Sequence, residues 1–279
     1  QDAASAASTI TKYINEYPDT PELNRMKALI LLSHYAQEDY AAVIQDMGEI
    51  DPDMLNDKER DDVVLAYALS MIQEERYEEA SAQLGILSLI SDRHDTEAMF
   101  YTAYTDFIGK RYDKAEEGFN QTKDAQAFHR PSRYYLAEIA LATKEYSEAE
   151  ASAEAYLEEY KQDEYTLDMK RIQGEALYAQ QRYLKAAIVL EEYLAAADSP
   201  KRETLYQLGM AHFNTKEHLR APEIFAMVSE GDDAITQNAQ LHAGLSYLSL
   251  DDKNKARLCF EQAASMTADP QVRERAMYN

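Results

Sequence analysis

Six histidines and one cysteine are the side chains of this sequence best suited to bind a metal or to act as a base or nucleophile. A thiolate zinc site needs several cysteines, and the chain has only Cys259. The histidines show no His-Glu-x-x-His spacing or comparable ligand set; they are His34, His94, His129, His212, His218 and His242. The sequence therefore predicts no metal site and no catalysis based on these residues.

Phosphate, acyl-transfer and calcium chemistry are also not indicated. None of the eight glycines has a phosphate-binding spacing, and there is no Gly-x-Ser-x-Gly motif. Acidic pairs stand at expected helix starts or turns, where they cap free N–H groups and lack the central glycine of a calcium loop; examples are Asp61-Asp62, Asp232-Asp233 and Asp251-Asp252. We expect a protein that is not an enzyme and has no cofactor.

Three polar residues, His34, Asp106 and His212, fall at positions that otherwise face the core of the helices described below. We interpret them as one-residue errors of register. A shift of one residue would place Phe107 in the core and the Asp106 carboxylate near Lys110.

The charge balance limits the class of partner. The chain has 28 basic and 51 acidic residues, a net charge of −23, which repels nucleic-acid phosphates and anionic lipids. No run of eighteen apolar residues is present. We expect no nucleic-acid partner and no direct membrane insertion.

A short phrase recurs along the chain: an aromatic residue, two mostly polar residues, then alanine or valine. Successive copies are 34 to 37 residues apart, and their small residues are Val43, Ala80, Ala115, Ala149, Ala186, Ala221 and Ala256. A packing residue follows four positions later, and another small or apolar residue stands twelve positions earlier, as at Gly174, Gly209 and Gly244. Gaps of three and four place side chains on one helical face. The repeat predicts pairs of amphipathic helices, A and B, which cross at the small residues.

This pattern resembles the tetratricopeptide repeat, a helical hairpin of about 34 residues. The resemblance rests on seven agreeing copies, although the tryptophan of the family is absent. It implies an all-α fold, a right-handed superhelical solenoid of helix-turn-helix hairpins. It also implies a non-catalytic scaffold that binds a protein or peptide in a concave groove lined by the A helices.

The register predicts a single array over residues 1–279. A lone B helix at 3–17 comes first, and the start of a further A helix at 270–279 comes last. Seven hairpins lie between them, at about 22–50, 57–90, 94–122, 130–160, 164–197, 200–229 and 233–267. Half-hairpins at both ends are typical of a piece of a longer array, which we expect this chain to be.

The whole chain is also similar to large repeat proteins of the Bacteroidetes cell envelope. The segments that carry this similarity are Tyr112–Phe119, Asp233–Ala239 and Ala276–Asn279. The similarity implies a periplasmic or cell-envelope location.

Groove residues follow from the A-helix positions that line the groove in the repeat family. They are Tyr35, Glu97, Phe100, Tyr104, Phe107, Tyr134, Glu138, Arg171, Glu175, Tyr178, Tyr206, Met210 and Phe213. In the third hairpin we expect Met99 and Ala103 to face the core, beside the groove face of Phe100, Tyr104 and Phe107. Tyrosine and phenylalanine suit peptide recognition because they offer large contact areas at low entropic cost. The Lys, Asn and Arg set that clamps a C-terminal carboxylate in some members is missing, and Glu138 and Glu175 favour a basic-hydrophobic segment as the partner.

Two alternative functions remain open. One is a carbohydrate-binding helical-repeat protein of nutrient uptake, since tyrosine stacks on sugars, although the absence of tryptophan argues against it. The other is the interaction domain of a larger enzyme or regulator. Nothing in the sequence identifies the partner itself.

Overall fold

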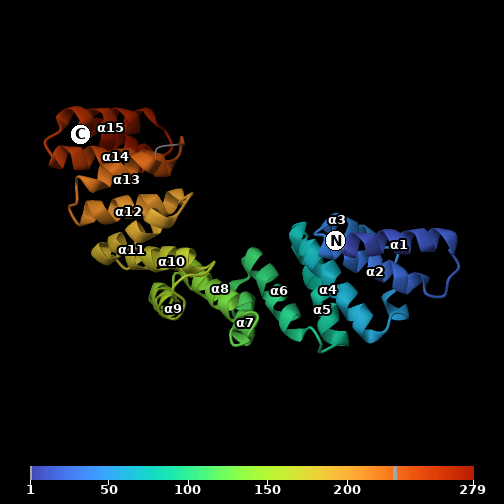
Figure 1. The fold of residues 1–279 in the computed structure, drawn as a ribbon. Coiled ribbons are helices and arrows are strands. Elements are labelled where there is room, and N and C mark those ends of the chain that lie inside the picture. The colour runs from blue at the N-terminus through green and yellow to red at the C-terminus, as the bar shows by residue number, and fades with distance from the viewer. Residues whose placement is uncertain (1, 229–230) are drawn as a thin grey trace. The chain divides into compact units, whose positions relative to one another are not determined.

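The structure is a computed structural model that describes residues 2–228 and 231–279. Across these residues the chain forms α-helices and one short 3-10 helix, and it has no strand (Figure 1). The predicted all-α helical-repeat solenoid is confirmed. The predicted end of the sixth hairpin, residue 229, lies outside the described residues.

Two kinds of helix alternate along the chain. The A helices are α2 (Leu23–Ala36), α4 (Asp57–Gln73), α6 (Asp95–Ile108), α8 (His129–Ala142), α10 (Thr166–Ala179), α12 (Arg202–Asn214), α14 (Ala234–Ser249) and α16 (Pro270–Tyr278). The B helices are α1 (Asp2–Glu16), α3 (Tyr40–Met47), α5 (Tyr77–Ile90), α7 (Tyr112–Thr122), α9 (Tyr146–Glu159), α11 (Tyr183–Ala196), α13 (Arg220–Val228) and α15 (Lys253–Ser265). The 3-10 helix, Pro52–Met54, connects α3 to α4.

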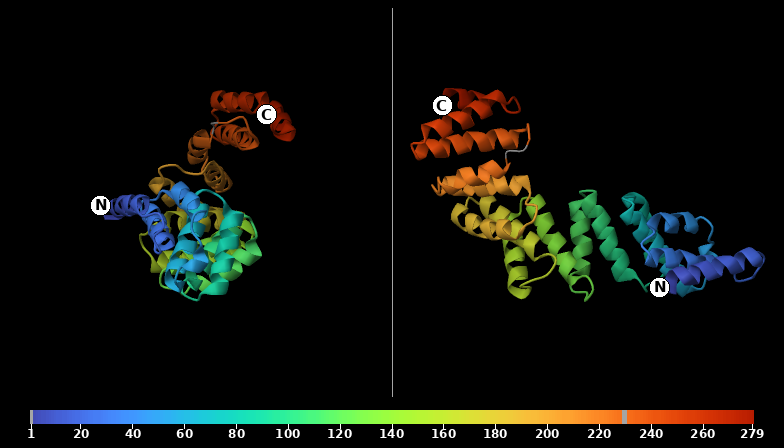
Figure 2. Two further views of the ribbon diagram at one scale, coloured as in Figure 1. Left: turned by 90° about the vertical axis from the view of Figure 1, so that its right-hand side faces the viewer. Right: turned by 45° about the horizontal axis from the view of Figure 1, so that its top comes forward.

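The chain divides into two compact units, Gln1–Tyr135 and Leu136–Asn279, and each is described by itself. Within a unit, A helices of successive hairpins pack on one another: α2 on α4 and α4 on α6 in the first, α10 on α12, α12 on α14 and α14 on α16 in the second. The B helices α11, α13 and α15 each pack between two of these A helices, and α12 to α15 are the orange to red layers of Figure 2. The single array and its right-handed superhelix stay predictions.

The small residues predicted at the helix crossings lie in the core. All seven, from Val43 to Ala256, are at most 1% exposed. Size is critical there, because a Cβ added to Gly209 would lie 2.5 Å from the Phe225 ring, and one added to Gly244 would lie 2.5 Å from an atom of Phe260. The prediction that small residues allow A and B helices to approach closely is confirmed.

The turns from A to B helices share one backbone conformation. A non-glycine residue with φ between 57° and 67° occupies the same place in every turn, namely Glu38, Glu75, Lys110, Lys144, Gln181, Lys216 and Asp251. The next residue donates its N–H to a carbonyl five positions back, as Arg76 does to Met71 at 2.8 Å. This bond is the helix-ending arrangement that usually uses glycine. Here the bond holds ordinary residues in the left-handed conformation despite its steric cost.

The interpretation of Asp106 as an error of register is wrong. Asp106 is buried, with 9% of its surface exposed, and Arg111 donates to its carboxylate at 2.6 Å. The partner is therefore Arg111 and not Lys110. Phe107 stays half-buried and does not take its place.

The two histidines at equivalent positions also have charged partners. The same interpretation is wrong for His212, which is 9% exposed, whereas the His34 side chain is 29% exposed. His34 lies 2.7 Å from Asp46, and Nε2 of His212 lies 2.9 Å from Glu191. Arg220 shares the Glu191 carboxylate and holds the pKa of that carboxyl below its usual value. These groups link A helices to B helices within each unit.

We expect Gly209→Ala to lower the free energy of unfolding by about 1–3 kcal/mol, because the added methyl group overpacks the contact with Phe225. Gly85→Ala is the matched control: Gly85 lies in helix α5, and a Cβ there meets nothing within 4 Å. That change should raise the free energy by about 0.5–1 kcal/mol through helix propensity. Urea unfolding measures both, and equal effects would contradict the packing explanation.

Candidate functional site

We call the A-helix surface the face of the A helices that carries the predicted groove residues. In the first unit it includes Tyr35 of α2, Tyr104 and Phe107 of α6, and Tyr134 of α8, all half-buried. The rings of Tyr104 and Phe107 lie 5.6 Å and 5.1 Å from the ring of Tyr135. These residues therefore pack on their neighbours and still keep part of each side chain exposed.

Tyr101 of α6 also belongs to this surface, although the sequence did not predict it. Burial raises the pKa of Tyr35, and the nearby hydroxyl of Tyr101 raises it further. Burial raises the pKa of Tyr101 itself, with an added effect of Glu97. The side chains of α2 and α6 thus approach one another beside α4. Tyr101 directly follows Phe100, so a register shifted by one residue on α6 would have predicted Tyr101 as a groove residue.

The prediction of Phe100 as an exposed groove residue is wrong, because its side chain is 6% exposed. Its ring stacks on Phe128 at 4.5 Å and meets Phe119 edge-on at 5.5 Å. Met99, predicted to face the core, is 38% exposed. Phe100 and Ala103, three positions apart, lie together on the buried face of α6.

In the second unit, α10 contributes Tyr178 and α12 contributes Tyr206, Met210 and Phe213, all half-buried. Burial raises the pKa of Tyr206 to about 12, and Tyr178 adds to the rise while Arg275 opposes it. Burial, followed by the neighbouring Tyr183, raises the pKa of Tyr178. Neutral phenols on adjacent A helices therefore lie together on this surface.

Five phenol groups of the A-helix surface make no hydrogen bond to any part of the chain that the structure describes: Tyr35, Tyr101, Tyr104, Tyr178 and Tyr206. By contrast, the hydroxyl of Tyr156, in the core, donates to Asp163 at 2.6 Å. Polar groups removed from water normally have partners. The five hydroxyls are thus available to a ligand, each on a ring that offers apolar contact.

A charged network lies on the same surface of the second unit. Arg171 has a side chain only 3% exposed, and it pairs with Glu138, with Asp168 at 3.1 Å and with Glu175 at 3.3 Å. Thr204 donates to Glu175 as well. Burial lowers the pKa of Arg171, but the carboxylates of Glu138 and Glu175 more than offset it, and the net shift is upward.

This network changes the role expected for Glu138 and Glu175. The sequence placed Glu138 and Glu175 in the groove as free acidic groups, with Arg171 beside them as another groove residue. In the structure Arg171 is buried and binds both carboxylates. Three carboxylates thus surround one buried guanidinium.

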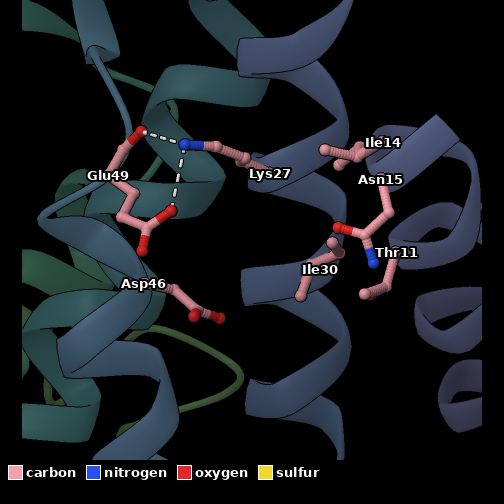
Figure 3. A pocket seen from close by; sticks show the side chains of 7 residues that line it. All are labelled: Thr11, Ile14, Asn15, Lys27, Ile30, Asp46 and Glu49. Carbon is pink, nitrogen blue, oxygen red and sulfur yellow. Dashed lines mark hydrogen bonds and ion pairs between the residues drawn. The ribbon is translucent and has the colours of Figure 1, made fainter. Parts of the chain in front are cut away.

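A separate pocket of about 200 Å³ lies among α1, α2 and α3 (Figure 3). The ammonium of Lys27 reaches the Glu49 carboxylate at 3.0 Å, and Asp46 binds His34. Its charged groups therefore already have partners within the chain, which makes it a weaker candidate than the A-helix surface.

The described residues contain no cluster of three or more His, Cys, Asp or Glu placed to hold a metal. Among the same residues, no helix combines the length and apolar character needed to cross a membrane.

No protein-family model matches the sequence, and no curated protein matches it either. Solved structures do resemble it. YrrB, described as a tetratricopeptide-repeat (TPR) protein with an unusual peptide-binding site, gives a TM-score of 0.56 at 18% identity, over 67% of this chain and 94% of YrrB.

A tetratricopeptide-repeat protein from Parabacteroides merdae gives a TM-score of 0.53 at 12% identity, over 98% of this chain and 99% of that one. The quorum sensor NprR from B. thuringiensis gives a TM-score of 0.57 at 13% identity, over 91% of this chain and 79% of NprR. The fold of this chain is thus that of tetratricopeptide-repeat proteins, as the sequence predicted.

We expect Arg171→Met to lower the free energy of unfolding by about 3–5 kcal/mol, because it leaves buried carboxylates without their cation. Adding Glu138→Gln and Glu175→Gln should restore much of the loss. Lys170→Met is the control, since Lys170 forms an exposed pair with Glu192 that contributes at most about 1 kcal/mol. Urea unfolding measures all three, and similar losses for Arg171→Met and Lys170→Met would contradict the network's role.

Proposed function

We propose that this chain is a non-catalytic scaffold that binds a segment of another protein on its A-helix surface. The observation that carries the proposal is the set of hydroxyls without partners on five half-buried tyrosines, three in the first unit and two in the second. A bound segment offers backbone N–H and C=O groups that can satisfy them, while its apolar side chains cover the rings. The rings of these tyrosines pack against the core clusters. Their hydroxyls form no hydrogen bond with the described residues.

The chemistry of the surface favours a basic-hydrophobic segment. Aromatic rings favour apolar side chains, and the carboxylates around Arg171, together with the acidic charge of the chain, favour a lysine or arginine nearby. The net charge of −23 acts in the same direction at longer range, because it attracts cationic segments and speeds their association.

Structural neighbours support a protein-interaction role. YrrB, which has the same fold, is described as having a peptide-binding site. For the setting, we propose an assembly of the bacterial cell envelope, and this part rests on the sequence resemblance alone.

The experiment is a selection of random peptides displayed on phage against the purified chain. We expect the selected peptides to alternate large apolar residues with lysine or arginine. Tyr178→Phe combined with Tyr206→Phe should weaken their binding by about tenfold or more, since two hydrogen bonds of about 0.5–1.5 kcal/mol are lost and the ring contacts remain. Fluorescence anisotropy measures the affinity.

Tyr13→Phe with Tyr17→Phe is the matched control and should leave affinity unchanged, since Tyr13 of α1 and Tyr17, just after α1, are exposed. Peptides that bind the Tyr178 and Tyr206 variant as tightly as the native chain would contradict the proposed site. Enrichment of acidic peptides would contradict the proposed partner chemistry.

A further inference from the structure

Large apolar side chains are exposed on the outer side of two adjacent hairpins in the second unit. Leu184 and Ile188 of α11 are 65% and 57% exposed, and Leu219, just before α13, is 75% exposed. Leu184 and Leu219 are one repeat apart, at the same position of successive hairpins. The other hairpins have small or polar residues there, namely Ala41, Glu78, Asp113, Ser147 and Asn254.

These three residues form one patch, which we call the outer patch. Leu184, Ile188 and Glu191 follow one another at spacings of four and three, so they lie on one face of α11. Arg220, the first residue of α13, binds the Glu191 carboxylate at 2.7 Å and 2.9 Å. Since Leu219 directly precedes Arg220, this bond ties the start of α13 to the face of α11 that carries Leu184 and Ile188.

A hollow of about 390 Å³ adjoins the patch. It is lined by residues of the two A-to-B turns and the start of α11: Gln181, Arg182, Tyr183, Leu184, Lys185 and Thr215. One wall is rigid, because Glu150 of α9 holds the Arg182 guanidinium in a salt bridge. The patch is thus apolar, exposed and hollowed along one edge.

The outer patch is electrically balanced in a strongly acidic chain. Residues 181–196 contain two basic and two acidic side chains, and residues 215–223 contain two of each as well. Most of them are paired, as in the bonds from Arg220 to Glu191 and Glu223. Lys185, Lys216 and Glu217 form no ion pair with any described residue, so both signs of charge remain free at the edge.

We propose that the outer patch is a self-association surface on which a second copy of this chain docks through its own outer patch. Two copies with a charge of −23 each repel one another over most of their surface. They can approach closely where the local charge is zero. A two-fold interface sets each patch against itself, which buries the exposed leucines and brings the free lysines of one copy near Glu217 of the other.

This surface is separate from the A-helix surface, because it lies on B helices and their turns. Self-association therefore leaves the proposed peptide site open. The outcome of one experiment does not decide the other.

Sedimentation velocity over a wide range of protein concentration tests the proposal. We expect a reversible equilibrium between monomer and dimer that becomes stronger as salt is added, because salt screens the repulsion between the two acidic chains. Leu184→Ser with Leu219→Ser should weaken dimerisation by at least about tenfold. Lys185→Glu with Lys216→Glu should weaken it too, by making the patch acidic.

Leu89→Ser is the matched control, since Leu89 is 87% exposed on α5 of the first unit and lies outside the patch. It should leave the equilibrium unchanged. A native chain that stays monomeric at every concentration and salt level would overturn the proposal. So would a dimer that is insensitive to the Leu184 and Leu219 changes, or one that dissociates as salt is added.

Discussion

Close contact between a small residue of an A helix and a large residue of its B helix, as at Gly174, Gly209 and Gly244, is the constraint on which the rest of the structure depends. Gly209 under Phe225 and Gly244 under Phe260 leave no room for even one methyl group. Each contact fixes how two helices cross, and its repetition about every 35 residues fixes the next hairpin in the same way. It also determines which face of the A helix is buried in the core and which face stays partly exposed to solvent.

The partly exposed face is the A-helix surface, and it is the candidate site for binding. Its tyrosines are half-buried by neighbouring A helices, which orients the rings, yet five of their hydroxyls bind nothing in the described chain. In the second unit the same face holds Arg171 among three carboxylates. A surface that is ordered by the fold but not needed by it has little entropy left to lose when a partner binds.

The sequence predicted the hairpins and their crossings well, because only small residues fit there and their spacing is visible without a structure. It failed on α6, where it placed Met99 inside and Phe100 outside. The two residues differ by about 100° around the helix, and both are apolar, so the pattern alone did not separate them.

Other features escaped the sequence because they depend on partners elsewhere in the chain. Asp106 and Arg111 pair across a turn, and His212 finds Glu191 on the preceding hairpin. From the sequence alone Arg171 is expected at the surface, because its partner Glu138 stands 33 residues earlier in the chain. The left-handed turn residues, such as Glu75, are not glycine, so the sequence does not mark their conformation. The hydrogen bond at the helix end offsets the strain of that conformation.

The central claim, that the fold leaves the tyrosine hydroxyls of the A-helix surface unused, is tested most directly by the free energy of unfolding of one variant. In it, phenylalanine replaces Tyr35, Tyr101, Tyr104, Tyr178 and Tyr206 together. We predict a value within about 0.5 kcal/mol of the native chain, whereas Tyr156→Phe alone should cost about 1 kcal/mol, since it removes the bond to Asp163. A loss of several kcal/mol in the five-residue variant would show that the hydroxyls are bonded within the fold and would contradict the claim.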